Sequence, residues 1–264
     1  MSEIDREFTD GADGPGRVLD IALAAAGLIV LAPVIVIVSL AILLESGRPI
    51  LFSQVRLGKN GRHFKIYKFR KFGPKPDSTG RPLTLKGDPR MTRVGRFLEA
   101  SKIDEVPQLF NVLRGDMAIV GPRPESLAFE DCFRGQFRAV LDHRPGIFGP
   151  SQVAFRSEGK LYPEGDDPTE FYRRVLFPTK ANLDLCYFRR RTFLGDLAWL
   201  LRGALAVFGV TSAPSSNSAA LGDWQPDDAR ATQHFLSFGS AAETRRAGVT
   251  RTPRDKSVSG SRTP

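Results

Sequence analysis

The chain has 264 residues, 41% of them hydrophobic, which is enough for one sizeable domain with appendages. Its formal net charge of +9 predicts an anionic partner, and nucleic acid, a phosphorylated substrate and lipid headgroups all fit that charge. The two cysteines, Cys132 and Cys186, fit no metal spacing, so a zinc site is excluded and buried free thiols in a reducing compartment are expected.

An apolar segment from Ile21 to Leu44 follows an acidic start that is expected to be mobile. It is long enough to cross a hydrocarbon core of about 30 Å, whereas a signal peptide has a basic start and a shorter apolar run. Pro33 lies in its middle and predicts a kink, so the helix could either span the membrane or dip in and return. Residues 46–76 carry nine Lys or Arg and no acid, which places them on the cytoplasmic side.

Residues 47–70 alternate apolar and basic side chains around Gly58-Lys59-Asn60-Gly61, a tight-turn signal, and predict a β-hairpin. The second strand is expected to turn Phe64, Ile66 and Phe69 inward and Lys65, Tyr67 and Lys68 outward. Its basic face could lie against anionic headgroups, bind phosphate directly, or do both.

Residues 73–90 are rich in Pro, Gly, Lys and Asp and predict a mobile loop that ends at Asp88-Pro89-Arg90. A helix is expected at residues 92–98. Its apolar face would hold Val94, Phe97 and Leu98, while its arginines, Arg93 and Arg96, could meet a pyrophosphate or lie in solvent.

Asp104 and Glu105 are predicted to open a short helix, because Pro107 is tolerated only in a first turn. The helix N-terminus favours an ionised Asp104 by roughly 0.3–1 kcal/mol, and such an anion could be a nucleophile or a metal ligand. Capping is the alternative, because Ser101 and Asp104 have capping-box spacing. Further on, prolines flank Arg123 and fix the backbone around a cation suited to phosphate.

Residues 127–142 are predicted to form a helix, residues 144–152 a turn-rich loop of the kind that often carries binding groups, and residues 168–190 one or two helices. Residues 193–208 are apolar but contain acid and base, which favours an amphipathic helix in the plane of the membrane. Beyond residue 210 the composition predicts disorder.

Taken together, the motifs resemble the bacterial sugar transferase family, the monotopic phosphoglycosyl transferases, in its small form, over about residues 16–208. The residues that carry this resemblance are Arg17 to Asp20, Phe52-x-Gln54-x-Arg56-x-Gly58, Tyr67-Lys68-Phe69-Arg70, Asp88-Pro89-Arg90, Asp104-Glu105-x-Pro107-Gln108-Leu109, Gly121-Pro122-Arg123-Pro124-Glu125 and Pro145-Gly146-Ile147.

The resemblance implies a two-step transfer of a sugar 1-phosphate. Asp104 would attack the sugar-linked phosphorus of a UDP-sugar and release UMP, and polyprenyl (undecaprenyl) phosphate would then take the phosphosugar from Asp104. Glu105 would help Asp104 hold Mg²⁺, and Arg123 would hold phosphate. Further contacts to substrate or phosphate are expected from Lys59, Lys68, Arg70, Arg90, Arg96 and Gln108.

The implied setting is the cytoplasmic face of the bacterial inner membrane, at the start of exopolysaccharide, capsule or O-antigen assembly. Membrane lipids, downstream glycosyltransferases and a homo-oligomer are the expected partners, and nucleic acid is not. Several departures from the family are visible in the sequence, among them Lys102-Ile103 in place of the usual Leu before the acidic pair. Ala32 precedes Pro33 where Ser is common, and Lys71-Phe72 replaces the usual Thr-Met, a change expected to touch no group that the mechanism needs. The loop after Gly146 also varies, which leaves the sugar open.

The expected fold is mixed α/β and helix-rich, with a Pro-kinked re-entrant membrane helix, a cytosolic catalytic domain that contains a small β-hairpin or sheet, and interfacial amphipathic helices. The expected segments are a leader at 1–15, the membrane helix at 16–46, the catalytic domain at 47–210 and a disordered tail at 211–264. The alternatives are a membrane-tethered basic binding module, which would grip nucleic acid or lipid without chemistry, and an inactive scaffold.

Overall fold

The structure is a computed structural model that describes residues 15–73, 83, 88–156, 158–162 and 167–207. Contacts divide the chain into Met1–Trp224 and Gln225–Pro264, and all of the described residues belong to the first unit. The predicted leader, most of the predicted loop at 73–90 and the predicted tail at 211–264 lie outside the described residues.

The described part is helix-rich with two small sheets, so the predicted mixed α/β class is confirmed. Its α-helices are α2 (Pro15–Ser46), α3 (Arg93–Ser101), α4 (Gln108–Arg114), α5 (Pro150–Ala154), α6 (Pro168–Phe171), α7 (Phe177–Phe188) and α8 (Phe193–Val207). The strands β1 (Leu51–Leu57) and β2 (His63–Phe69) form an antiparallel pair, and β3 (Ala118–Val120) and β4 (Gly146–Phe148) a parallel one.

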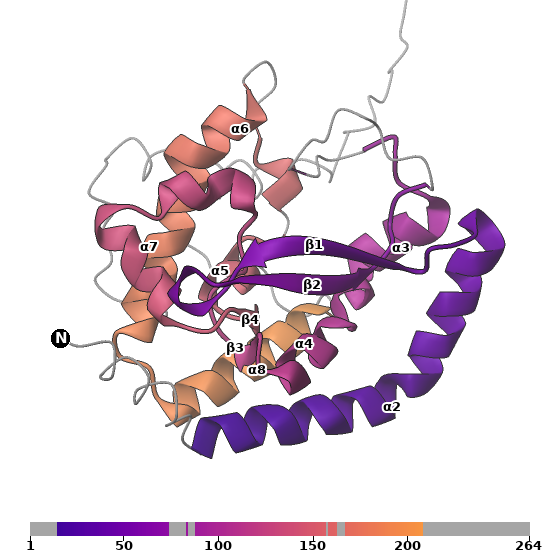
Figure 1. The fold of residues 1–264 in the computed structure, drawn as a ribbon, viewed down its shortest axis with the longest axis horizontal. Coiled ribbons are helices and arrows are strands. Elements are labelled where there is room, and N and C mark those ends of the chain that lie inside the picture. Colours follow the sequence, from indigo (N-terminus) through magenta and orange to yellow (C-terminus); the bar gives the residue numbers. More distant parts are fainter. Residues whose placement is uncertain (1–14, 74–82, 84–87, 157, 163–166, 208–264) are drawn as a thin grey trace, which may run out of the picture. The chain divides into compact units, whose positions relative to one another are not determined.

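Helix α2 is, within the described residues, the one helix long and apolar enough to cross a membrane. Only 11% of its most apolar window is buried inside the molecule, so most of that surface faces outward. Pro33 lies within the helix, and Figure 1 shows that α2 changes direction along its length. A proline that removes one helical hydrogen bond accounts for a bend of this kind. Whether the helix spans the membrane or re-enters it stays a prediction.

Both ends of α2 are tied to the rest of the domain by charged side chains. Near its start, the guanidinium of Arg17 donates to the carbonyl of Val112, in the last turn of α4, at 2.6 Å. Near its end, the carboxylate of Glu45 accepts from the main-chain N–H of Arg93, the first residue of α3, at 2.7 Å. A cation at a helix C-terminus and an anion at a helix N-terminus are both favourable placements, so each end of α2 caps a different helix.

The β1/β2 hairpin is confirmed, with a register that runs from Leu51 opposite Phe69 to Leu57 opposite His63. Its turn is a short 3-10 segment in which Asn60 has a φ of 57°. The expectation for Lys68 is wrong. Its side chain is only 16% exposed and faces inward to a carboxylate, because side chains alternate along a strand and Lys68 therefore shares the face of Phe64 and Ile66.

The free edge of β2 is covered by the side chain of Asn111 from α4. Its Oδ1 accepts from the N–H of Tyr67 at 3.1 Å, and its Nδ2 donates to the carbonyl of Lys65 at 2.7 Å. Asn111 is fully buried and thus satisfies the main-chain groups that a neighbouring strand would otherwise take. This contact docks α4, and the turn before it, onto the hairpin.

Two other predictions differ from the structure. The helix at 92–98 is confirmed as α3, with Leu98 buried, but Phe97 is 61% exposed. Neither cysteine is buried: Cys132 is half-buried and Cys186 is exposed, although both are free thiols.

The segment predicted as one helix at residues 127–142 is instead two 3-10 helices, Leu127–Cys132 and Gly135–Asp142. Gly135 has a φ of 54°, a left-handed conformation that interrupts an α-helix. The turn-rich loop at 144–152 contains β4 and the start of α5. Parallel pairing of β4 with β3 brings this segment beside the stretch that follows β3.

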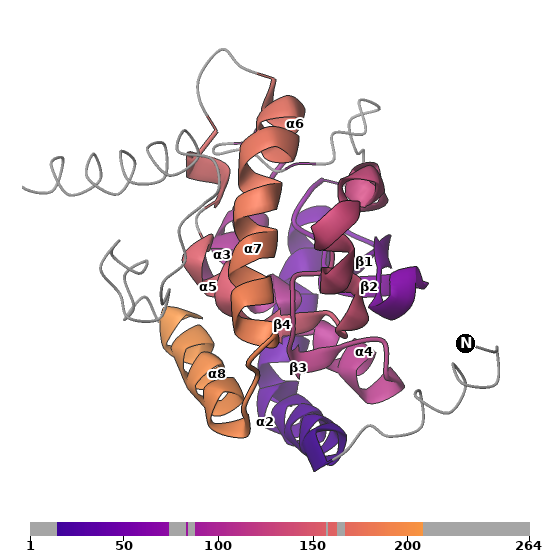
Figure 2. The ribbon, with the colours of Figure 1, turned by 90° about the vertical axis from the view of Figure 1, so that its left-hand side faces the viewer.

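The C-terminal helices agree with prediction. Residues 168–188 form α6 and α7, joined by a π-helical turn at Tyr172–Leu176. Helix α8 is amphipathic, with Trp199 buried and an outer row of exposed apolar side chains: Phe193, Leu194, Leu197, Leu201 and Leu205. Figures 1 and 2 both show α8 at the end of the unit where the first half of α2 lies.

Candidate active site

The acidic pair lies in a turn between two helices. α3 ends at Ser101, Lys102 adopts a left-handed conformation with a φ of 62°, and a 3-10 turn then covers Ile103–Glu105. Helix α4 starts only at Gln108, after Pro107. The prediction that the pair opens the helix is therefore wrong by one turn, because the left-handed residue reverses the chain before the pair.

Asp104 caps no helix. It is 1% exposed, its Oδ2 lies 3.4 Å from the Nζ of Lys71, and its Oδ1 is buried without a hydrogen-bond partner. The capping interpretation is thus not what the structure shows. A buried carboxylate oxygen without a donor is costly for folding, so its presence next to Lys71 and to Glu105 of the acidic pair suggests a functional group.

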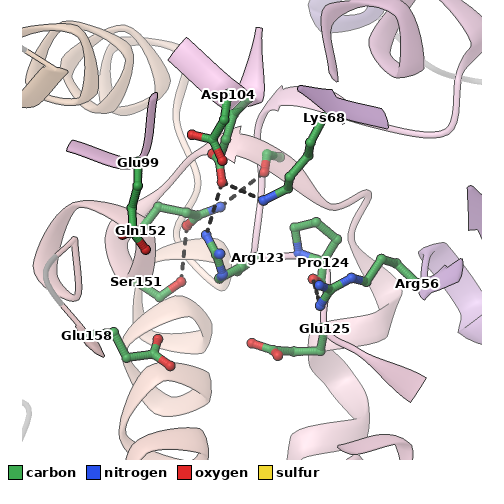
Figure 3. A network of polar contacts seen from close by, with 12 residues as sticks. Arg56, Lys68, Glu99, Asp104, Arg123, Pro124, Glu125, Ser151, Gln152 and Glu158 are labelled. Carbon is green, nitrogen blue, oxygen red and sulfur yellow. Dashed lines mark hydrogen bonds and ion pairs between the residues drawn. The ribbon is translucent and has the colours of Figure 1, made fainter. Parts of the chain in front are cut away.

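Glu105 is held by two cations from other parts of the chain. Its Oε1 accepts from the Nζ of Lys68 at 2.7 Å, and the Nη1 of Arg123 lies 3.9 Å away. Burial alone would raise the pKa of Glu105, but the positive charges of Lys68, Arg123 and Lys102 outweigh it and hold the pKa well below its usual range. Figure 3 shows Lys68 and Arg123 converging on the region beside Asp104.

Arg123 reaches this place because its loop packs against the 144–149 segment, main chain to main chain. The N–H of Gly121 donates to the carbonyl of Phe148 at 2.9 Å, and the N–H of Gly146 donates to that of Pro122 at 2.9 Å. A Cβ atom on Gly121 would lie 2.2 Å from the carbonyl oxygen of Arg144, so only glycine fits. The two motifs Gly121-Pro122 and Pro145-Gly146 are therefore two halves of one contact.

A small polar cavity lies between the hairpin, the acidic turn and the Arg123 loop. It is lined by Arg56, Ile66, Lys68, Glu105, Gln108, Arg123, Pro124, Gly146 and Ile147. Arg56 donates to the carbonyl of Pro124 at 3.4 Å, while its Nε is buried without a partner. The Nε2 of Gln108 is likewise buried and unpartnered. Donors left free beside a cation-lined cavity are suited to an anionic ligand.

The structure brings together five of the predicted site residues: Asp104, Glu105, Arg123, Lys68 and Gln108. The other four lie elsewhere. Lys59 is in the hairpin turn, at the opposite end of β2 from Lys68. Arg70 and Arg96 donate to main-chain carbonyls, and Arg90 binds the carboxylate of Asp88. Phosphate binding by these four residues stays a prediction.

Sequence reasoning missed Lys71. It was expected to touch no group that the mechanism needs, and the structure corrects this, because its Nζ lies 3.4 Å from the Oδ2 of Asp104. It also missed Lys180 and Asp184, both 4% exposed on α7 and close in space to the Arg123 loop. The available signal was a lysine and an aspartate one turn apart on a largely apolar helix.

The acidic turn is where the divalent metal that the family resemblance implies would bind. No group of three or more His, Cys, Asp or Glu that could hold a metal occurs within the described residues. Mg²⁺, however, is usually bound by one or two carboxylates together with substrate phosphates. The adjacent carboxylates of Asp104 and Glu105 fit that smaller requirement.

Comparison with known proteins places this site in a family. The family described as bacterial sugar transferase matches residues 15–210. A UDP-glucose:undecaprenyl-phosphate glucose-1-phosphate transferase of Caulobacter vibrioides is 45% identical over 140 residues, which cover 52% of this chain and 52% of that protein. The undecaprenyl-phosphate glucose phosphotransferase of Komagataeibacter xylinus is 41% identical over 182 residues, which cover 66% of this chain and 32% of that protein.

The exopolysaccharide production protein PSS of Rhizobium leguminosarum bv. phaseoli is 47% identical over 183 residues, which cover 62% of this chain and 92% of that protein. The chain thus spans about half the length of the Caulobacter relative and most of the Rhizobium one. The predicted family and its enzyme class, the polyprenyl-phosphate phosphoglycosyl transferases, are confirmed. The chain belongs to the bacterial sugar transferase family.

Proposed function

We propose that this protein transfers a sugar 1-phosphate from a UDP-sugar to undecaprenyl phosphate and releases UMP. The observation that carries the proposal is the buried, unpartnered Oδ1 of Asp104 among the cations Lys68 of β2, Lys71 just after β2, and Arg123. The names of the relatives, two of which specify undecaprenyl phosphate, support the acceptor. The sugar is left open by the site.

In the first step, Asp104 Oδ1 forms a bond to the sugar-linked phosphorus. The bond from that phosphorus to the bridging oxygen breaks, and its electron pair leaves with UMP. In the second step, an oxygen of undecaprenyl phosphate attacks the same phosphorus, and the bond to Asp104 breaks and restores the carboxylate. A covalent intermediate divides one difficult transfer into two easier ones.

The cations around the pair have separate tasks in this scheme. Arg123 presents a planar guanidinium that can hold phosphate oxygens, and Lys71 lies beside the attacking carboxylate. Lys68 keeps Glu105 ionised and oriented. Asp104 and Glu105 would hold Mg²⁺, which supplies charge neutralisation for phosphoryl oxygens when it is bound.

The membrane setting belongs to the same proposal. The outward apolar surface of α2 and the outer row of α8 would lie in one leaflet of the inner membrane, and the lysines and arginines of the hairpin would keep the site on the cytoplasmic side. Residues 47–210 would form the catalytic domain. Placing the site at the interface would let a water-soluble nucleotide and a lipid meet there.

The test is nucleotide release by detergent-solubilised protein given Mg²⁺, undecaprenyl phosphate and a panel of UDP-sugars. Asp104→Asn should lower UMP release by roughly 10³-fold or more, because the nucleophile is lost. Glu130→Gln is the matched control, since this carboxylate is 56% exposed and faces only the edge of the hairpin at His63. It should keep wild-type activity.

A second measurement identifies the intermediate. Without the acceptor, a radiolabelled sugar should remain attached to wild-type protein and be absent from Asp104→Asn. UDP in place of UMP would contradict the reaction class. No nucleotide release from folded protein with any donor would favour the binding or scaffold alternatives, and the scaffold also requires that Asp104→Asn cells still make their glycan.

A further inference from the structure

Helix α7 lies behind the Arg123 loop and carries two buried charged side chains one turn apart. Lys180 and Asp184 are each 4% exposed, although lysine and aspartate are almost never buried unless they are paired. The reaction scheme above uses neither of them. Each makes contacts that lead to a different end of the loop Gly121–Glu125.

Asp184 reaches the first end of the loop through a chain of hydrogen bonds. Its Oδ1 accepts from the N–H of Ser151 at 3.0 Å, and its Oδ2 lies 2.8 Å from the Oγ of Ser151. That Oγ lies 3.1 Å from the Oε1 of Gln152. The Nε2 of Gln152 then donates to the carbonyls of Gly121 (3.0 Å) and Gly146 (3.1 Å). Figure 3 shows the dashed line that joins Ser151 to Gln152, beside Arg123.

The direction of this chain depends on one proton. The hydroxyl of Ser151 has a single hydrogen, so it cannot donate to Asp184 and to Gln152 at once. If Asp184 is protonated on Oδ2, it donates to Ser151, Ser151 donates to Gln152, and every hydrogen is used once. Burial raises the pKa of Asp184 to about 7, against the lowering effect of Ser151 and Lys180 and with a further rise from Glu125.

Lys180 reaches the other end of the loop. Its Nζ lies 3.2 Å from the Oε1 of Glu125, the last residue of the loop, and also meets Glu158 at 3.1 Å and the hydroxyl of Tyr172 at 2.9 Å. These three partners match the three donors of an ammonium group. Lys180 therefore fixes the side chain of Glu125 within a fully satisfied buried cluster.

The loop needs such outside support because of its composition. Pro122 and Pro124 have no N–H, so the loop cannot be held by its own donors at those positions. Its carbonyls are held instead: that of Gly121 by Gln152, that of Pro122 by Gly146 and that of Pro124 by Arg56.

We propose that Asp184 and Lys180 are positioning residues that fix the two ends of the loop Gly121–Glu125 and so hold Arg123 beside Glu105. This inference rests on the proposed function for its effect on catalysis, but its effect on the loop can be measured without activity. A shift of the loop would move the guanidinium away from the phosphates, and misplacement of about 0.5 Å already matters in such sites.

The test compares Asp184→Ala with Asp184→Asn in the full chain. Alanine ends the hydrogen-bond chain. Asparagine preserves it, because its Oδ1 can accept from the Ser151 N–H and its Nδ2 can donate to the Ser151 Oγ. Cys186→Ser is the matched control, since it lies two residues away on the exposed side of the same helix.

The first readout is hydrogen–deuterium exchange of the loop amides, chiefly those of Gly121 and Gly146, which donate to main-chain carbonyls. Asp184→Ala should speed their exchange by roughly tenfold, the effect of losing one buried hydrogen bond. Asp184→Asn and Cys186→Ser should stay within about twofold of wild type. Lys180→Gln should speed exchange at the Glu125 end.

The second readout is the kinetics of UMP release. Asp184→Ala should lower kcat by roughly tenfold while KM for the UDP-sugar changes less, and Asp184→Asn should restore kcat.

Unchanged exchange in the loop would overturn the proposal. Exchange that rises equally in the β1/β2 hairpin would also overturn it, since that pattern means general loosening of the domain. If Asp184→Ala does not fold, Ser151→Ala removes the same link and decides the question by the same readouts. If wild type releases no UMP, the proposed function is wrong, but the exchange measurement still decides whether Asp184 and Lys180 hold the loop.

Discussion

Replacing Arg70 tests whether this side chain anchors the fold or binds a ligand. The sequence predicts a phosphate-binding arginine here. In the structure its guanidinium donates to five acceptors around the end of α2 and the start of the hairpin. These are the carbonyls of Pro49 (2.6 Å), Gly47 (2.7 Å), Ser46 (3.0 Å) and Phe72 (3.1 Å) and the hydroxyl of Ser46 (2.9 Å). With 7% exposure, Arg70 joins the apolar helix to the first sheet.

The magnitude follows from these contacts. A hydrogen bond from a charged donor contributes about 1.5–3 kcal/mol net, and water will replace part of what Arg70→Met removes. A loss equal to two such bonds at the lower end gives about 3 kcal/mol. For a domain of this size that lowers Tm by roughly 6–12 °C. Arg70→Lys keeps one or two of the contacts and should lose about half as much.

The assay is thermal unfolding in detergent micelles, with Arg174→Met as the control because that side chain is 73% exposed. The control should leave Tm within about 1–2 °C, as for other surface changes. KM for the UDP-sugar should change little in Arg70→Lys. An unchanged Tm in Arg70→Met, together with a raised KM, would refute the anchoring role and support the phosphate contact that the sequence predicts.

Three further predictions follow from contacts described above. Gly121→Ala should lower UMP release more than tenfold, because its Cβ would lie 2.2 Å from the carbonyl oxygen of Arg144, whereas Gly16→Ala, with nothing within 4 Å, should be neutral in the same assay. Asn111→Ala leaves a main-chain donor and acceptor of β2 unpaired and should destabilise by about 2–3 kcal/mol in denaturant unfolding, while an effect below about 0.5 kcal/mol would contradict the docking role. Burial raises the pKa of Asp184 from 3.8 to about 7, so between these pH values the folded chain holds a proton that the unfolded chain has released. The contribution of this group to stability is therefore complete at low pH and is lost as the pH rises from about 4 to about 7. Asparagine cannot ionise, so the Tm of Asp184→Asn relative to that of wild type should rise across this pH window and level off above it. A Tm difference that does not change with pH would mean that the pKa of Asp184 has its ordinary value.

The parts of the fold that sequence predicts correctly are those set by neighbouring residues. The turn at Gly58–Gly61 specifies the hairpin, and α3 and the helices at 168–188 follow from local apolar spacing. Local alternation also gives the two faces of β2, and it places Lys68 on the same face as Phe64 and Ile66. The expectation that Lys68 points outward departed from that alternation, and the side chain is found against Glu105.

The candidate site divides in the same way. The acidic pair and Arg123 are recognisable from their motifs, since each motif has a distinctive local chemistry. The contact of Lys71 with Asp104 depends on how the hairpin lies against the acidic turn, and the contact of Lys180 with Glu125 joins residues 55 positions apart. Such contacts are products of tertiary packing. Local patterns do not encode them, and the left-handed Lys102 was likewise invisible because lysine rarely adopts that conformation.

The contacts at the two ends of α2 connect the lipid environment with the chemistry. Arg17 holds the helix that follows the acidic turn, and Glu45 holds the helix that precedes it. The angle between the two halves of α2 therefore sets the spacing of the two helices that carry the acidic turn between them. If α2 lies in the membrane as proposed, a bilayer thickness that alters this angle would act on Asp104 without touching it. Turnover is expected to vary with the acyl-chain length of the lipids around the protein, which would make the membrane a regulator of this enzyme as well as its support.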